Sequence, residues 1–128
     1  DEHIVSAADL KKNYPSANVG EYIEHDAEIA RDASRHLRDG DPHATMVYFG
    51  SVDETGHKVG FHPSVKPYVA AIEVIDGHVG QLLKAIEGRP SYKQENWLIL
   101  VSTDHGGKGT GHGDGGKLPG RHPPARPP

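Results

Sequence analysis

The chain of 128 residues is long enough for one domain, and with 34% hydrophobic residues it can build only a small core. Its 14 basic and 18 acidic side chains leave a net charge of -4, which argues against binding to duplex nucleic acid through phosphate contacts. The sequence contains no cysteine and ten histidines, so any metal site must use histidine and carboxylate ligands.

The first predicted element is an amphipathic helix. Residues 1–18 are rich in turn formers and are interpreted as mostly loop, without the basic start and apolar run of a signal peptide. No stretch of the chain approaches the roughly 18 apolar residues of a membrane span, so we expect a soluble protein. From about residue 19 to residue 37, apolar side chains recur at steps of three and four. This spacing predicts a helix, which the Asp-Gly-Asp-Pro sequence of residues 39–42 should end.

Two short apolar runs predict buried strands with a helix between them. Residues 44–49 and 98–101 are β-branched, aromatic or aliphatic, and both runs are too short for a helix. Residues 63–87 carry apolar side chains at helical spacing, with Pro63 and Pro67 near the start and Gly88 beyond the end. Strand, helix and strand form a βαβ unit with parallel strands. We therefore predict an α/β fold with a mostly parallel sheet flanked by helices.

The C-terminal region is predicted to be a tail. Residues 118–128 contain five prolines in eleven positions, which predicts an extended or disordered segment after a domain of residues 1–117. The glycines between Gly111 and Gly116 partly match nucleotide-binding loops. However, Leu118 stands where a P-loop needs Ser or Thr, and Pro119 prevents the helix whose N-terminus would hold phosphate.

Each predicted strand is followed by an acid paired with an imidazole. Asp53 and His57 follow the first strand in a predicted loop of residues 50–62, Asp104 and His105 follow the second strand, and His112 comes after a glycine-rich loop. Carboxylate oxygens and imidazole nitrogens are metal-ligand types, whereas each residue alone is more often a turn or surface residue. Both loops should open on the same edge of the sheet, where open α/β sheets place their ligands. The five residues together predict a metal site.

Three segments together resemble the alkaline phosphatase superfamily, and most of all its type I phosphodiesterase/nucleotide pyrophosphatase branch. They are residues 52–60 (Val-Asp-Glu-Thr-Gly-His-Lys-Val-Gly), the helix with Asp76, Val79, Gly80 and Leu82, and residues 102–106 (Ser-Thr-Asp-His-Gly). The resemblance spans roughly residues 44–113. It implies a partial alkaline-phosphatase-like α/β sandwich and a two-metal hydrolase of small-molecule phosphoesters, usually with zinc. It also implies that Asp53, His57 and His112 hold one ion and that Asp104 and His105 hold the other.

The resemblance also implies groups that we do not find in this sequence. In the family the second ion is completed by an N-terminal Asp and by a Thr or Ser nucleophile at the start of a helix. Ser51, Thr55, Thr103 and Thr110 lie on the predicted ligand-bearing loops, not at such a helix N-terminus. We therefore expect a C-terminal-half fragment of the metal-binding core, inactive or nearly so by itself. Two alternatives stay open, namely a sulfatase-like hydrolase and a non-catalytic metal-binding fragment.

Overall fold

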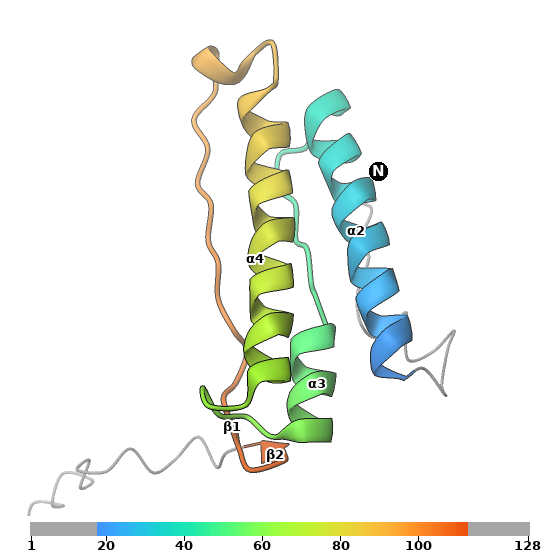
Figure 1. The fold of residues 1–128 in the computed structure, drawn as a ribbon. Coiled ribbons are helices and arrows are strands. Elements are labelled where there is room, and N and C mark those ends of the chain that lie inside the picture. The colour runs from blue at the N-terminus through green and yellow to red at the C-terminus, as the bar shows by residue number, and fades with distance from the viewer. Residues whose placement is uncertain (1–17, 113–128) are drawn as a thin grey trace, which may run out of the picture.

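The structure, a computed structural model, describes residues 18–112. These residues form the helices α2 (Val19–Asp39), α3 (Ser51–Val59) and α4 (Lys66–Glu87), the short 3-10 helix η1 (Tyr92–Gln94), and the strands β1 (Gly107–Lys108) and β2 (Gly111–His112). Figure 1 shows α2 and α4 side by side, with α3 next to the first half of α4 and the strands at the same end of the molecule. The predicted tail of residues 118–128 and all of the predicted loop of residues 1–18 except Asn18 lie outside the described residues, so the domain boundary at residue 117 stays a prediction.

Helix α2 confirms the first predicted helix. The Asn18 side chain accepts hydrogen bonds from the N–H groups of Gly20 at 2.9 Å and Glu21 at 3.4 Å, and the Glu21 carboxylate accepts from the Asn18 N–H at 2.6 Å. This reciprocal capping box satisfies amides that have no partner inside the helix. The helix ends at Gly40, whose N–H donates to the His36 carbonyl.

Helix α4 confirms the second predicted helix, beginning at Lys66 rather than near residue 63. Proline in its first turn is compatible with a helix start because the N–H that proline lacks would have had no partner there. The core between the helices has two parts. One contains Tyr22 and Ile29 with Val47 and Phe49 packed against them, and the other contains Leu37, Ala85 and Ile86 with Leu82 and Trp97 packed against them.

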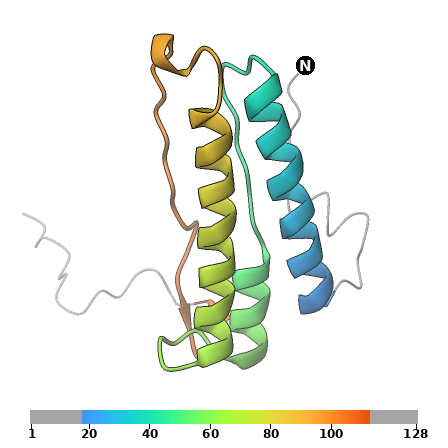
Figure 2. The same cartoon turned by 45° about the horizontal axis from the view of Figure 1, so that its top comes forward.

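The described residues have the mixed helix and strand content of the predicted α/β fold, but the predicted parallel sheet is not confirmed among them. Residues 44–49 and 98–101 are extended, but no backbone hydrogen bond joins them within residues 18–112, and the one sheet found there is the antiparallel β1–β2 pair. Figures 1 and 2 show the two extended segments on either side of α4, both running toward the end that holds α3 and β1. The two segments therefore run in the same direction, as predicted for the parallel strands. A ladder also needs a neighbour about 4.8 Å away, and neither segment has one here.

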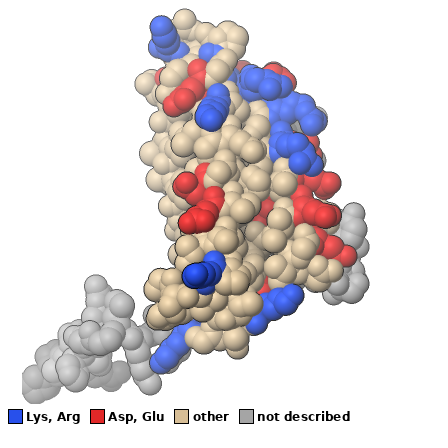
Figure 3. Space-filling view, viewed as in Figure 1, with Lys and Arg blue, Asp and Glu red and all other residues tan. Residues whose placement is uncertain are grey.

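The predicted burial is wrong for the second segment and holds only in part for the first, whose Val47 and Phe49 pack against the core. Leu98 and Leu100 are 81% and 82% exposed, and Met46 is 67% exposed. Figure 3 shows that uncharged residues cover much of the face formed by α4 and the extended segment after it. Strand side chains become buried when a sheet packs against another layer, and no such sheet forms among residues 18–112.

Residues 51–59, predicted to lie in a loop, form helix α3 instead. The carboxylate of Asp26, on α2, is 1% exposed and accepts hydrogen bonds from the N–H groups of Gly50 at 3.0 Å and Ser51 at 2.9 Å. The first amides of a helix have no partner inside it, and the helix dipole favours a negative charge beside them. Gly60, with φ 108°, ends the helix in the left-handed region that favours glycine. This helix depends on a contact that local sequence does not reveal.

Another long-range contact holds the opposite end of the molecule together. Arg89, which is 8% exposed, donates to the main-chain carbonyls of Leu37 and of Gly40, the latter at 2.8 Å, and its Nη2 donates to the Glu95 carboxylate at 2.7 Å. Trp97 Nε1 donates to the same carboxylate at 2.8 Å. The hydrogen bonds from Arg89 are the main reason that the pKa of Glu95 is lowered to about 2. These bonds fix the point at which the extended chain leaves toward the predicted site.

Candidate metal centre

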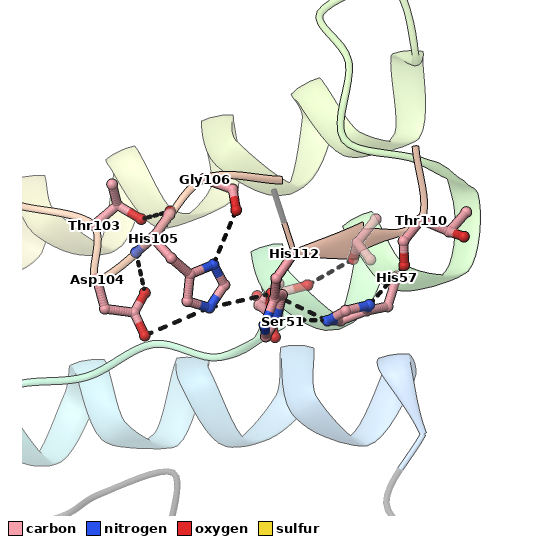
Figure 4. A network of polar contacts seen from close by, with 10 residues as sticks. Ser51, His57, Thr103, Asp104, His105, Gly106, Thr110 and His112 are labelled. Atoms are coloured by element: carbon pink, nitrogen blue, oxygen red, sulfur yellow. Dashed lines mark hydrogen bonds and ion pairs between the residues drawn. The ribbon is translucent and has the colours of Figure 1, made fainter. Parts of the chain in front are cut away.

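The five predicted ligands lie together at the end of the molecule where both extended segments stop. We call Asp53, His57, Asp104, His105 and His112 the Asp/His cluster. Asp53 and His57 stand one turn apart on the same face of α3, because residues i and i+4 of a helix point the same way. Asp104 and His105 come at the end of the second extended segment, and His112 is on β2. Figure 4 shows the three imidazoles turned toward one another.

One oxygen of Asp53 is the centre of the cluster. Asp53 Oδ1 lies 3.3 Å from His112 Nε2, 3.5 Å from His57 Nε2 and 3.9 Å from His105 Nε2. This oxygen is buried and has no hydrogen-bond partner among residues 18–112. A buried carboxylate oxygen without a donor requires an explanation, and a bound cation is one that fits three converging imidazole nitrogens.

The distances in the cluster suit a tetrahedral metal. With zinc bonds of about 2.0–2.1 Å, two ligand atoms of a tetrahedral site lie roughly 3.3 Å apart. The Asp53–His112 and Asp53–His57 distances are close to that value, and ligand atoms of Asp53, His105 and His112 all lie within 4.8 Å of one another. His57 Nε2 and His112 Nε2 are 2.8 Å apart, which is a hydrogen-bond distance and is shorter than the spacing of two ligands on one tetrahedral ion. The distances from Asp53 and the chemistry of the residues fit a divalent metal.

Main-chain carbonyls orient two of the imidazoles. His57 Nδ1 lies 2.8 Å from the Thr110 carbonyl oxygen, and His105 Nδ1 lies 3.3 Å from the Gly106 carbonyl oxygen. A carbonyl can only accept, so each Nδ1 carries the proton when the ring is neutral. The lone pair of His57 Nε2 then accepts a hydrogen bond from His112 Nε2 at 2.8 Å, and His105 Nε2 carries a lone pair 3.9 Å from Asp53 Oδ1. The outer hydrogen bond from Nδ1 is typical of histidines that bind metals. The sequence did not reveal it because both acceptors belong to the main chain.

Asp104 lies at the exposed rim of the cluster. Its side chain is 61% exposed, its Oδ2 lies 3.6 Å from His105 Nε2, and its Oδ1 accepts from the His105 N–H at 3.0 Å. The structure brings all five predicted ligands into one group and does not divide them into two sets, because Asp53 is close to His105 as well as to His57 and His112. Their assignment to two separate ions stays a prediction.

Tyr48 is a neighbour of the cluster that the sequence analysis missed. Burial, and then the negative charges of Asp104 and Asp53, raise the pKa of the Tyr48 hydroxyl above its usual value. The hydroxyl therefore keeps its proton at neutral pH. The available signal was the position of Tyr48 near the end of the first apolar run, next to the acids that follow it.

The sequence analysis missed Asp26 as the residue that caps α3, and it placed Ser51 in a loop. Asp26 falls four residues after Tyr22 and three before Ile29, on the buried face of α2, so an acid in the apolar stripe was the signal available. Ser51 was expected in a loop, but it is the first residue of α3, and this expectation was wrong. Its side chain is buried, with 1% of the residue exposed, and its Oγ has no hydrogen-bond partner among the described residues.

One comparison with known proteins finds a family for this chain. The model of one protein family, described as type I phosphodiesterase / nucleotide pyrophosphatase, matches residues 5–114, a span that contains the whole Asp/His cluster. No curated protein and no solved structure matches the chain. Among the described helices, none combines the length and the apolar character needed to cross a membrane. Because the family model covers most of the sequence, the chain belongs to the type I phosphodiesterase / nucleotide pyrophosphatase family.

Proposed function

We propose that this chain carries the metal-binding residues of a hydrolase that cleaves small-molecule phosphoesters with two divalent ions, and that zinc is the metal. The observation that carries the proposal is Asp53 Oδ1, a buried carboxylate oxygen that faces three imidazole nitrogens and has no hydrogen-bond donor in the part of the chain that the structure describes. Membership of the phosphodiesterase family favours phosphoesters over the sulfatase-like alternative. Small-molecule phosphoesters are therefore the proposed substrate class.

The residues of the Asp/His cluster would form two sets of metal ligands. Asp53, His57 and His112 would hold one ion, and Asp104 with His105 would hold the other. When bound, such ions polarise the phosphoryl oxygens and make a hydroxyl or water nucleophile available at neutral pH. The chain itself contributes the anionic charge of Asp53 and Asp104, and the neutral imidazoles held in one tautomer by the Thr110 and Gly106 carbonyls.

A second candidate, a metal-binding chain without catalysis of its own, is favoured by the hydroxyl groups near the cluster. Ser51 is buried, so substrate cannot reach its oxygen in this conformation. The Thr55 hydroxyl donates to the Ser51 carbonyl at 2.7 Å, and the Thr103 hydroxyl donates to the His105 carbonyl at 2.6 Å. These three groups are buried or engaged, which supports the expectation that the 128-residue chain turns over slowly or not at all.

Zinc titration of the chain by calorimetry tests the metal site. We expect Asp53→Asn to weaken zinc binding by more than about 100-fold, beyond the 10- to 100-fold typical of an outer hydrogen-bond partner, because the amide removes the charge and half of the acceptor capacity. The control is His43→Ala, which removes an exposed histidine from the segment after α2. Equal zinc affinity in the parent chain and in Asp53→Asn, or an equal loss in His43→Ala, contradicts the proposed site.

Hydrolysis of an activated aryl phosphodiester with zinc present separates the two candidates. Turnover on the order of 1–1000 per second, lost in Asp104→Ala, favours the hydrolase acting alone. Zinc binding without turnover at that rate favours the metal-binding chain.

A further inference from the structure

Phe61 lies where the two ligand-bearing parts of the cluster meet. It follows Gly60, the residue at which α3 ends, and its ring contacts the His57 ring edge to face, with ring centres 5.2 Å apart and planes at 87°. On its other side the ring contacts Tyr68 of α4, at 5.6 Å and 70°. The aromatic ring thus packs against one residue of the Asp/His cluster without belonging to it.

Two glycines make room for the Phe61 ring. A Cβ atom built on Gly56, in α3, or on Gly107, in β1, would overlap the Phe61 ring, so the ring lies directly on both backbones. At Gly106, the residue before Gly107, a Cβ atom would meet nothing within 4 Å. Among the described glycines only Gly60 and Gly109 have positive φ, so neither Gly56 nor Gly107 is needed for its backbone conformation. Both are needed for the close approach of Phe61.

Hydrogen bonds near Phe61 also connect the end of α3 to the β1–β2 turn. The Phe61 N–H donates to the Gly109 carbonyl at 2.7 Å, and the next carbonyl, that of Thr110, accepts from His57 Nδ1 at 2.8 Å. The β1–β2 turn is therefore bonded to the end of α3 by one backbone contact and one imidazole contact. This turn leads directly to His112, whose Nε2 lies 3.3 Å from Asp53 Oδ1.

We propose that Phe61 is a positioning residue for the metal centre. Its ring, held between Gly56 and Gly107, keeps the β1–β2 turn against α3, so that His112 from the turn and His57 from the helix meet at Asp53. The inference rests on the proposed metal-binding function. A binding constellation must be held to within about 0.5 Å, and β1 and β2, with two residues each, are too short to provide this alone. A packed aromatic ring supplies a rigid contact between the two parts.

Adjacent glycines provide a matched test. Gly107→Ala introduces a methyl group into the Phe61 ring, whereas Gly106→Ala introduces the same group one residue away into open space. We expect Gly107→Ala to weaken zinc binding about 10- to 100-fold, the range for residues that orient metal ligands, and Gly106→Ala to change it less than about threefold. Circular dichroism of the metal-free proteins should show the same helix content in both.

A readout in the metal-free protein distinguishes this inference from the proposed function. Nitrogen NMR of the histidine rings at about pH 8, where imidazole is neutral, should show His57 protonated at Nδ1 in the parent chain and in Gly106→Ala. We expect this signature to be lost in Gly107→Ala because the turn no longer presents the Thr110 carbonyl. If the parent chain binds no zinc but the NMR pattern is as expected, the metal proposal fails and the role of Phe61 in placing the turn stands.

Substitutions of Phe61 itself complete the test. Phe61→Leu removes the flat ring without creating an overlap, so it should lower zinc affinity and lose the His57 signature without loss of helix content. Adding Gly107→Ala to Phe61→Leu should cost little more, because both changes act on one contact. Retention of zinc affinity and of the His57 signature in Phe61→Leu overturns the inference, including when Gly107→Ala does not fold. Equal behaviour of Gly106→Ala and Gly107→Ala overturns it as well.

Discussion

Replacement of Asp26 by alanine should destabilise the fold through the loss of α3. The carboxylate is 1% exposed and accepts two hydrogen bonds, from the N–H groups of Gly50 and Ser51, both at 3.0 Å or less. Each buried amide left without an acceptor costs about 1–3 kcal/mol. The removal of a buried charge offsets part of this loss, so we expect the free energy of unfolding to fall by about 2–4 kcal/mol.

The same carboxylate also acts on the helix through its charge. A negative group at a helix N-terminus stabilises it by about 0.3–1 kcal/mol when exposed and by up to about 2 kcal/mol when partly buried. Asp26→Asn keeps one acceptor oxygen and loses the charge. The free energy of unfolding should therefore fall by less in Asp26→Asn than in Asp26→Ala. This variant is the more informative one if Asp26→Ala does not fold, because a domain of this size has only about 5–15 kcal/mol of stability in total.

Urea unfolding of the metal-free chain, followed by circular dichroism, measures these differences. The control is Asp32→Ala, which removes an exposed acid of the same helix whose partner, Arg35, lies 3.0 Å away on the surface. Exposed ion pairs contribute about 0–1 kcal/mol, so this variant should stay close to the parent chain. If the unfolding free energies of Asp26→Ala and Asp32→Ala agree to within about 0.5 kcal/mol, the reasoning about the cap of α3 is refuted.

Two further predictions concern acid stability and glycine packing. The pKa of Glu95 is about 2 in the fold and 4.5 in its ordinary state, so its contribution to stability is complete above pH 4.5 and is lost as the pH falls through about 2. Glu95→Gln should therefore have a lower free energy of unfolding in urea than the parent chain at pH 6. This difference should shrink between pH 4.5 and pH 2, and a difference that stays constant would count against the pairing of Glu95 with Arg89. Gly77→Ala on α4, where a Cβ atom meets nothing within 4 Å, should stabilise the chain by about 0.4–1 kcal/mol, whereas Gly56→Ala on α3 should destabilise it because of the Phe61 ring. Equal thermal midpoints for these two alanine variants would contradict the close packing of Phe61.

Local sequence patterns were sufficient to predict the two long helices and to single out the five residues that the fold brings together in the Asp/His cluster. The apolar spacing in α2 and α4 extends over several turns, and few backbone conformations other than a helix place all of these apolar side chains on one buried face. The five members of the Asp/His cluster were identifiable because carboxylates and imidazoles follow two similar apolar runs. The common direction of those runs also followed from the helix between them, since a crossover of this length returns the chain to the same end.

Only the tertiary structure decided the state of α3, the pairing of the extended segments and the geometry of the cluster. The start of α3 depends on the Asp26 carboxylate, 24 residues before Gly50. Within residues 18–112, residues 98–101 do not pair in a sheet, and this depends on which segments lie next to them. The Asp/His cluster likewise includes the β1–β2 turn, which packs against Phe61 through Gly107, a contact between residues that are far apart in the chain. Sequence spacing specifies periodic faces and chemical types, because these depend on neighbouring residues along the chain. It does not specify which distant groups complete a hydrogen bond or meet at one oxygen, because those contacts exist only once the chain has folded.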